Sequence, residues 1–119
     1  MNTTTNFVGR LRVEVELRGA KLIQTGRASK SNERLRGEWI RVAMNCEALD
    51  GEGRALIANL RLNGETDDEK RADGVKHEAA LREIVKRGGH VVLYVTSAAW
   101  KGGIQKLNVS EYAVMEDGN

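Results

Sequence analysis

The sequence predicts an all-β fold with one helix, in the order strand, strand, strand, helix, strand, strand (β-β-β-α-β-β). Two observations predict this order. Five segments alternate apolar and polar residues with the period of two that is typical of half-buried strands. These segments are residues 7–18, 38–48, 54–63, 90–98 and 104–115. Between the third and the fourth, over residues 75–87, apolar residues recur at spacings of three and four, which favours an amphipathic helix. The length of 119 residues fits a single domain, residues 1–119.

The first strand is long and contains a glycine, Gly19, followed by a second apolar patch at residues 20–23. A glycine inside a strand often marks a bulge, so a bend here could let one strand serve two sheets. Residues 1–5 are polar and are predicted to be a flexible end. Residues 24–37 are rich in Gly, Ser and Asn and are predicted to form a basic loop.

The second strand, Glu38 to Ala48, carries two faces of different character. One face is apolar and is predicted to lie in the core: Ile40, Val42, Met44 and Cys46. The other face carries Trp39 and Arg41, and a tryptophan beside an arginine on a solvated sheet is typical of a stacking platform for bases. The alternative that Trp39 packs under the basic loop stays open. Cys46, the single cysteine, cannot form an internal disulfide and is predicted to be a small core side chain.

Turn and capping signals separate the next elements. The segment Asp50-Gly51-Glu52-Gly53 predicts a hairpin to the third strand, residues 54–63, whose inward residues are the even-numbered ones from Leu56 to Leu62. Residues 64–74 are highly charged and are predicted to be a polar connector or a short frayed helix, since Thr66 and Glu69 have capping-box spacing. A helix of about three turns is then expected, with Asp73 as N-cap and Gly88-Gly89 as its end.

Two strands close the chain. We expect Trp100-Lys101-Gly102-Gly103 to be the hairpin loop between them. In the last strand Leu107, Val109, Ala113 and Met115 are predicted to share the inward side, and residues 116–119 to be a flexible end.

Five strands with one helix between the third and the fourth is the element order of the OB-fold, a five-stranded Greek-key barrel. Residues 6–11 (Asn-Phe-Val-Gly-Arg-Leu) resemble the opening strand of bacterial single-stranded DNA-binding proteins, and residues 89–109 resemble the last hairpin of that family. The chain has few aromatic residues, 4%, and lacks the family's long acidic tail, so it is most similar to small tail-less binders of the phage, plasmid or primosomal type. The resemblance implies binding of single-stranded DNA, with RNA as the alternative polymer, and a role in DNA replication.

The resemblance also implies a binding face on strands two and three, flanked by two loops. Residues 18–41 hold seven basic and two acidic residues, so this part of the chain is locally positive. The residues expected to bind nucleic acid by stacking or phosphate contacts are Trp39, Arg41, Arg61, Arg27, Lys30, Arg34, Arg36, Trp100 and Lys101. For Trp100 the alternative is that it folds back over the mouth of the barrel.

No motif in the sequence predicts catalysis, a metal or a cofactor. His77, His90 and Cys46 lack the spacing of a zinc site, and no phosphate-binding loop or nucleophile elbow is present. No apolar run approaches the ~18 residues of a membrane span, and the start of the chain does not resemble a secretory signal. We therefore expect a cytoplasmic location without membrane contact. A homo-oligomer, a dimer or tetramer, is also expected, because a small open barrel leaves strand edges that another copy can cover. The rival interpretation is an OB module for protein interaction, which would use the apolar outer residues Val8, Ile57 and Val92.

Overall fold

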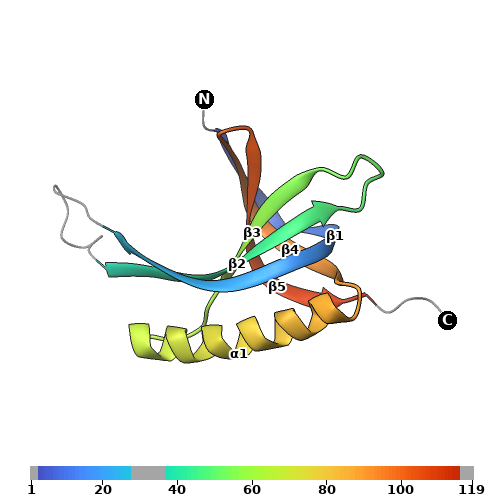
Figure 1. The fold of residues 1–119 in the computed structure, drawn as a ribbon. Helices are drawn as coiled ribbons and strands as arrows, with labels where there is room; N and C mark the ends of the chain where they lie inside the picture. The colour runs from blue at the N-terminus through green and yellow to red at the C-terminus, as the bar shows by residue number, and fades with distance from the viewer. Residues whose placement is uncertain (1–2, 28–36, 116–119) are drawn as a thin grey trace.

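The computed structural model describes the backbone of residues 3–27 and 37–115 and the side chains within 10–24, 39–100 and 102–115. The elements are β1 (Thr3–Arg27), β2 (Gly37–Ala48), β3 (Ala55–Arg61), α1 (Asp67–Lys86), β4 (His90–Lys101) and β5 (Ile104–Val114). This order is the one that the sequence predicts. The five strands close into a ring in the order β1-β2-β3-β5-β4, and α1 lies along β1 and β2 (Figure 1). Neighbouring strands are antiparallel except β3 and β5, which are parallel.

β1 pairs with two different strands, as the position of Gly19 suggested. Its first part pairs with β4 up to Glu16, its second part pairs with β2, and the register shifts between Leu17 and Gly19. β1 is longer at both ends than predicted, because residues 3–5 pair with β4 and residues 24–27 pair with β2. The predicted flexible start and the predicted basic loop are therefore wrong for these residues, since pairing with a neighbouring strand outweighs their low apolar content. Residues 1–2, 28–36 and 116–119 lie outside the described residues.

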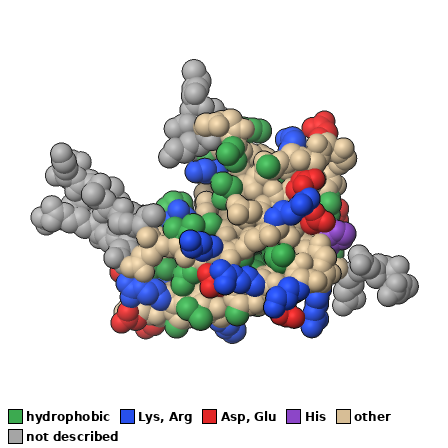
Figure 2. All heavy atoms as spheres, in the orientation of Figure 1, with side chains coloured by type: hydrophobic (Ala, Val, Ile, Leu, Met, Phe, Trp, Pro, Cys, Tyr) green, Lys and Arg blue, Asp and Glu red, His purple; other side chains and the backbone are tan. Residues whose placement is uncertain are grey.

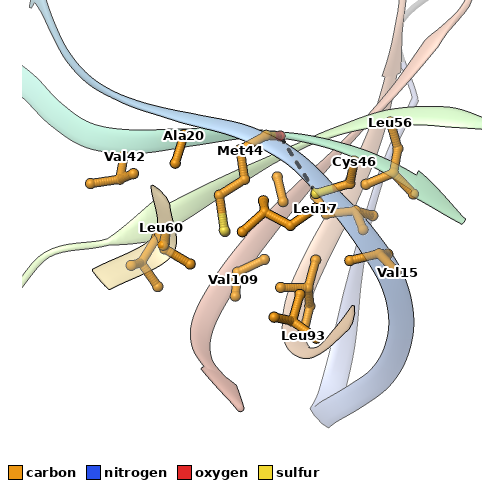
Figure 3. Close-up of a cluster of buried hydrophobic side chains, with 14 of the residues drawn as sticks. Val15, Leu17, Ala20, Val42, Met44, Cys46, Leu56, Leu60, Leu93 and Val109 are labelled. Atoms are coloured by element: carbon orange, nitrogen blue, oxygen red, sulfur yellow. Dashed lines mark hydrogen bonds between the residues drawn. The ribbon is translucent and has the colours of Figure 1, made fainter. Parts of the chain in front are cut away.

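The core is formed by the inward residues of all five strands and by Leu81 of α1. The predicted inward faces of the second and third strands are confirmed, since all of their residues are buried. These residues are Ile40, Val42, Met44, Cys46, Leu56, Ala58, Leu60 and Leu62. Figure 3 shows side chains from the different strands pointing toward one another in this core.

α1 begins earlier than predicted, at Asp67, and runs for 20 residues. The hydroxyl of Thr66 accepts a hydrogen bond from the Glu69 N–H at 3.2 Å, so the capping-box spacing marks the true start. Asp73 is not the N-cap; its carboxylate accepts from the Asn63 N–H at 2.9 Å. The prediction of a connector through residue 74 is wrong, since residues 67–74 belong to α1. The helical pattern was not visible there because the first turns of α1 largely face solvent and show no apolar periodicity.

The last hairpin differs from the prediction at two points. Lys101 pairs with Ile104, so Trp100 lies within β4 and the turn is Gly102-Gly103, both with positive φ (61° and 80°). Ser110 is an extra residue in β5, since Tyr94 pairs with Glu111 while Val95 pairs with Val109.

That extra residue reverses the alternation in the second half of β5. Leu107 and Val109 are buried as predicted, but Ala113 is exposed and Tyr112 packs against the core instead.

Side chains of α1 cover one edge of β1 near Ala20 and Leu22. Along this stretch the opposite edge of β1 pairs with β2. A carboxylate oxygen of Glu78 accepts a hydrogen bond from the Leu22 N–H at 2.6 Å, and Arg82 Nε donates to the Ala20 carbonyl at 3.1 Å. Glu78 and Arg82 also form an ion pair, 3.7 Å apart. An open strand edge is a template for pairing with another chain, and α1 blocks this stretch of it.

Replacing Glu78 with alanine is expected to lower the free energy of unfolding by about 1–3 kcal/mol, because the partly buried Leu22 N–H loses its acceptor. Urea unfolding followed by circular dichroism measures the loss. Glu83→Ala is the matched control, since Glu83 is exposed and its ion pairs with described residues are those with Lys86 and Arg87 at the surface. Equal losses in the two variants would contradict the role of Glu78.

Candidate functional site

Two adjoining hollows of about 420 Å³ and 410 Å³ lie on the outer face of β2, β3 and β5. They share Trp39, Arg41, Asn59 and Asn108, and we call the two together the β2–β3–β5 groove. The first hollow also contains Arg61, Lys70, Thr96 and Ser110. The second also contains Lys21, Ile57, Ala99 and Lys106.

The groove is positive and contains no acidic side chain among its described lining residues. Lys21, Arg61, Lys70 and Lys106 form no ion pair with any other described residue. Cations elsewhere behave differently: Arg10 pairs with Glu111 and most of the other described Arg and Lys side chains outside the groove also pair with carboxylates. Figure 2 shows such mixed charge on one face, where blue basic and red acidic side chains lie together. Positive charge is thus left uncompensated mainly in the groove, where it can attract an anion.

Trp39 and Arg41 form a stacked pair between the two hollows. The guanidinium carbon of Arg41 lies 3.8 Å from the centre of the Trp39 ring, which is a cation–π contact. Arg41 Nε also donates to Asn59 Oδ1 at 3.2 Å. Burial lowers the pKa of Arg41, but an arginine stays protonated in a protein. Trp39 is 36% exposed, so it lies on the solvent side as predicted, with one ring face covered by a planar cation.

Polar side chains extend this pair across the neighbouring strands. Asn59 of β3 and Asn108 of β5 are register partners in the parallel pair. Asn108 Nδ2 donates to Ser97 Oγ of β4 at 2.7 Å, and the main-chain carbonyl oxygen of Asn108 accepts from Thr96 Oγ1 at 3.2 Å. The floor of the groove therefore holds two hydrogen-bonded pairs, Arg41–Asn59 across β2 and β3 and Asn108–Ser97 across β5 and β4.

No protein-family model, curated protein or solved structure matches the chain. The case for a function therefore lies in the residues of the groove and their arrangement.

The structure brings together three of the predicted binding residues, Trp39, Arg41 and Arg61, in the groove. Trp100 is 44% exposed but does not line either hollow. The remaining predicted binding residues have side chains outside the described part of the structure. They are Arg27, Lys30, Arg34, Arg36 and Lys101.

Sequence reasoning missed Lys21, Lys70, Lys106 and Asn108 as groove residues. A signal existed for two of them, because Lys106 and Asn108 alternate with the buried residues of β5 and must face outward. No local signal marks Lys70, which lies in the polar first turns of α1.

The groups most familiar from catalysis have structural partners here. Burial raises the pKa of the Cys46 thiol to about 12, so at neutral pH it is not a thiolate nucleophile. His77 Nδ1 lies 3.0 Å from the Tyr112 hydroxyl, and this contact links α1 to β5. The Nε2 of His77 lies 3.4 Å from Asp73 on the same helix. Burial, with the Asp73 charge, raises the pKa of Tyr112, which is the opposite of an activated nucleophile. Among the described residues, no three His, Cys, Asp or Glu side chains gather to hold a metal, and no helix could span a membrane.

Proposed function

We propose that this protein is a single-domain OB-fold that binds single-stranded nucleic acid, chiefly DNA, along the β2–β3–β5 groove without strong sequence preference. The observation that carries the proposal is the groove itself, in which cations that pair with no described carboxylate surround the Trp39–Arg41 stack and no described lining residue is acidic. A polyanion with stacking bases fits this combination of positive charge and a flat cationic surface.

The strand order supports the OB-fold part of the proposal. The ring β1-β2-β3-β5-β4, with α1 between β3 and β4 in the chain and with β3 parallel to β5, is the arrangement expected of that Greek-key barrel. The OB-fold binds oligonucleotides across its second and third strands, and the groove lies over the same two strands here.

In the proposed complex the strand crosses the Trp39–Arg41 stack. A base stacks on the guanidinium of Arg41 or on the exposed part of the Trp39 ring, while Lys21, Arg61, Lys70 and Lys106 bind phosphates. Arg61 and Lys70 lie on one side of the stack, in the first hollow, and Lys21 and Lys106 lie on the other side, in the second. Four phosphate contacts would give log affinity against log salt a slope of about −3. The homo-oligomeric state and the cytoplasmic location stay predictions.

The rival function, a protein-interaction module, has less support. Val92 is 5% exposed, so the prediction that it faces outward is wrong, and Ile57 lines the cationic groove. Val8 has a side chain outside the described residues. These three residues therefore do not support an apolar outer surface for a protein partner.

Titration of the intrinsic tryptophan fluorescence with a dT oligomer of about 15 nucleotides tests the proposal. Quenching with micromolar affinity is expected at about 50 mM salt, with strong weakening at about 200 mM. No change in fluorescence, or binding that ignores salt, would overturn the proposed function.

Lys70→Glu is expected to weaken this binding about tenfold, because it removes one phosphate contact and adds a negative charge to the groove. The same titration measures it. Lys76→Glu is the matched control: Lys76 is also on α1 and forms no ion pair with a described residue, but it does not line the groove. If both substitutions weaken binding alike, the effect comes from net charge and not from the groove.

A further inference from the structure

Two asparagine amides lie side by side on the floor of the groove. Asn59 follows buried Ala58 on β3, and Asn108 follows buried Leu107 on β5, so both side chains face outward into the groove. The two residues are register partners, and neighbouring strands lie about 4.8 Å apart. Each amide can offer N–H donors and an acceptor oxygen to a ligand.

The orientation of the Asn59 amide is fixed by Arg41. A guanidinium N–H can only donate, so the atom that faces Arg41 Nε at 3.2 Å is Oδ1, and the NH₂ group points elsewhere. This NH₂ group has no partner among the described residues. Asn59 is only 9% exposed, but its NH₂ group is not fully shielded from solvent, because no fully buried side-chain nitrogen or oxygen of the described residues lacks a partner. Asn59 therefore presents free donors to the groove.

Asn108 offers an acceptor where Asn59 offers donors. Its Nδ2 donates to Ser97 Oγ, and its Oδ1 has no partner among the described residues. The groove floor thus carries unused donors on Asn59 and an unused acceptor on Asn108 at register-paired positions of neighbouring strands, between the Arg41 stack on one side and β4 on the other.

We propose that Asn59 and Asn108 together bind the Watson–Crick edge of one unpaired base, and that thymine or uracil fits best. The inference rests on the proposed function and adds base recognition at one position. A donor beside an acceptor matches any base edge that has an acceptor beside a donor. Thymine and uracil present acceptor, donor, acceptor along this edge, so they match in two orientations. Adenine, cytosine and guanine match in one. In a duplex the edge is already paired, so the contact also favours single strands.

The test compares three oligomers of equal length: dT, dA, and a dT analogue in which every base is N3-methylthymine. The methyl group removes the central donor of the base edge but keeps the phosphates and the stacking ring. We expect the wild-type protein to bind dT about tenfold more tightly than the methylated analogue, and more tightly than dA.

Asn108→Ala should remove most of this preference, because it weakens the binding of dT more than the binding of the methylated analogue. Ser97→Ala keeps the Asn108 amide but removes the partner that orients it, so it should reduce the preference by a smaller factor. Asn63→Ala is the control, because Asn63 is exposed and lies outside the groove. Unfolding curves show whether each variant is folded.

Three outcomes are decisive. A preference for dT that falls in Asn108→Ala and not in Asn63→Ala supports the inference. Equal affinities of the wild-type protein for dT and its methylated analogue overturn the base contact and leave the proposed function intact. Failure of every oligomer to bind at low salt overturns the proposed function and the base contact with it.

Discussion

Replacing Gly89 with alanine is expected to lower the free energy of unfolding by about 3–5 kcal/mol. Gly89 has a φ of +75°, in the left-handed region, and an added Cβ would overlap the carbonyl oxygen of Leu17. The Gly89 carbonyl also accepts a hydrogen bond from the Leu17 N–H at 2.6 Å, so the two backbones are held together at this point. The overlap cannot be relieved by a side-chain movement, because the atoms that clash belong to the backbone of β1.

Urea unfolding of the purified variant measures this loss. Gly88→Ala is the matched control, since Gly88 also has a positive φ, +109°, but no atom lies within 4 Å of its added Cβ. Its expected cost is the backbone strain alone, about 1–3 kcal/mol. If Gly88→Ala costs as much as Gly89→Ala, the close approach to Leu17 does not limit the position.

Replacing Trp39 with alanine is expected to weaken oligonucleotide binding by about 1–3 kcal/mol, the usual contribution of one stacked base. Two effects act in the same direction. The ring surface is lost, and Arg41 loses the ring on which its guanidinium lies at 3.8 Å, so the cation is less well positioned for a base. A filter-binding or anisotropy assay with labelled dT gives the affinity without depending on tryptophan emission.

Trp100→Ala provides the comparison, because Trp100 is the more exposed tryptophan and lines neither hollow. It should bind dT within about twofold of the wild-type protein and should keep the fluorescence quenching that Trp39→Ala loses. If Trp100→Ala weakens binding as much as Trp39→Ala, the bound strand follows the β4–β5 hairpin and the proposed path is wrong.

A substitution of Arg41 separates the two effects in Trp39→Ala. Arg41→Lys keeps the charge but loses the planar surface and the fixed fork of donors that reaches Asn59. If stacking on the cation matters, this variant should lose affinity for dT while its salt slope stays close to that of the wild-type protein.

The inward faces of the strands could be predicted because burial on one side of a strand imposes a period of two. Val42 and Met44 are fully buried where that period places them. The alternation fails in β5 after Ser110, because an extra residue there shifts the faces and no local signal in the sequence marks it. The start of α1 was missed for a related reason: its first turns face solvent, and only the capping box at Thr66 marks them.

The candidate site could be predicted only where it lies on one continuous strand pair. Trp39, Arg41 and Arg61 come from β2 and β3, which are joined by a recognisable turn and pair in the expected way. Asn108 reaches the groove through the parallel pairing of β3 with β5, and Lys70 reaches it from the helix. These contacts join segments that are far apart in the chain, and no short-range pattern specifies them.

The parallel pairing of β3 with β5 also has a consequence for folding. The pairs β1–β2, β2–β3 and β4–β5 form between consecutive strands, whereas the β3–β5 and β1–β4 seams join the two halves of the chain. Loop closure over such distances is costly in entropy, so both seams are expected to form late. Because Asn59 and Asn108 lie on opposite sides of the β3–β5 seam, a ligand held by both would act as a clamp between the halves and would slow their separation.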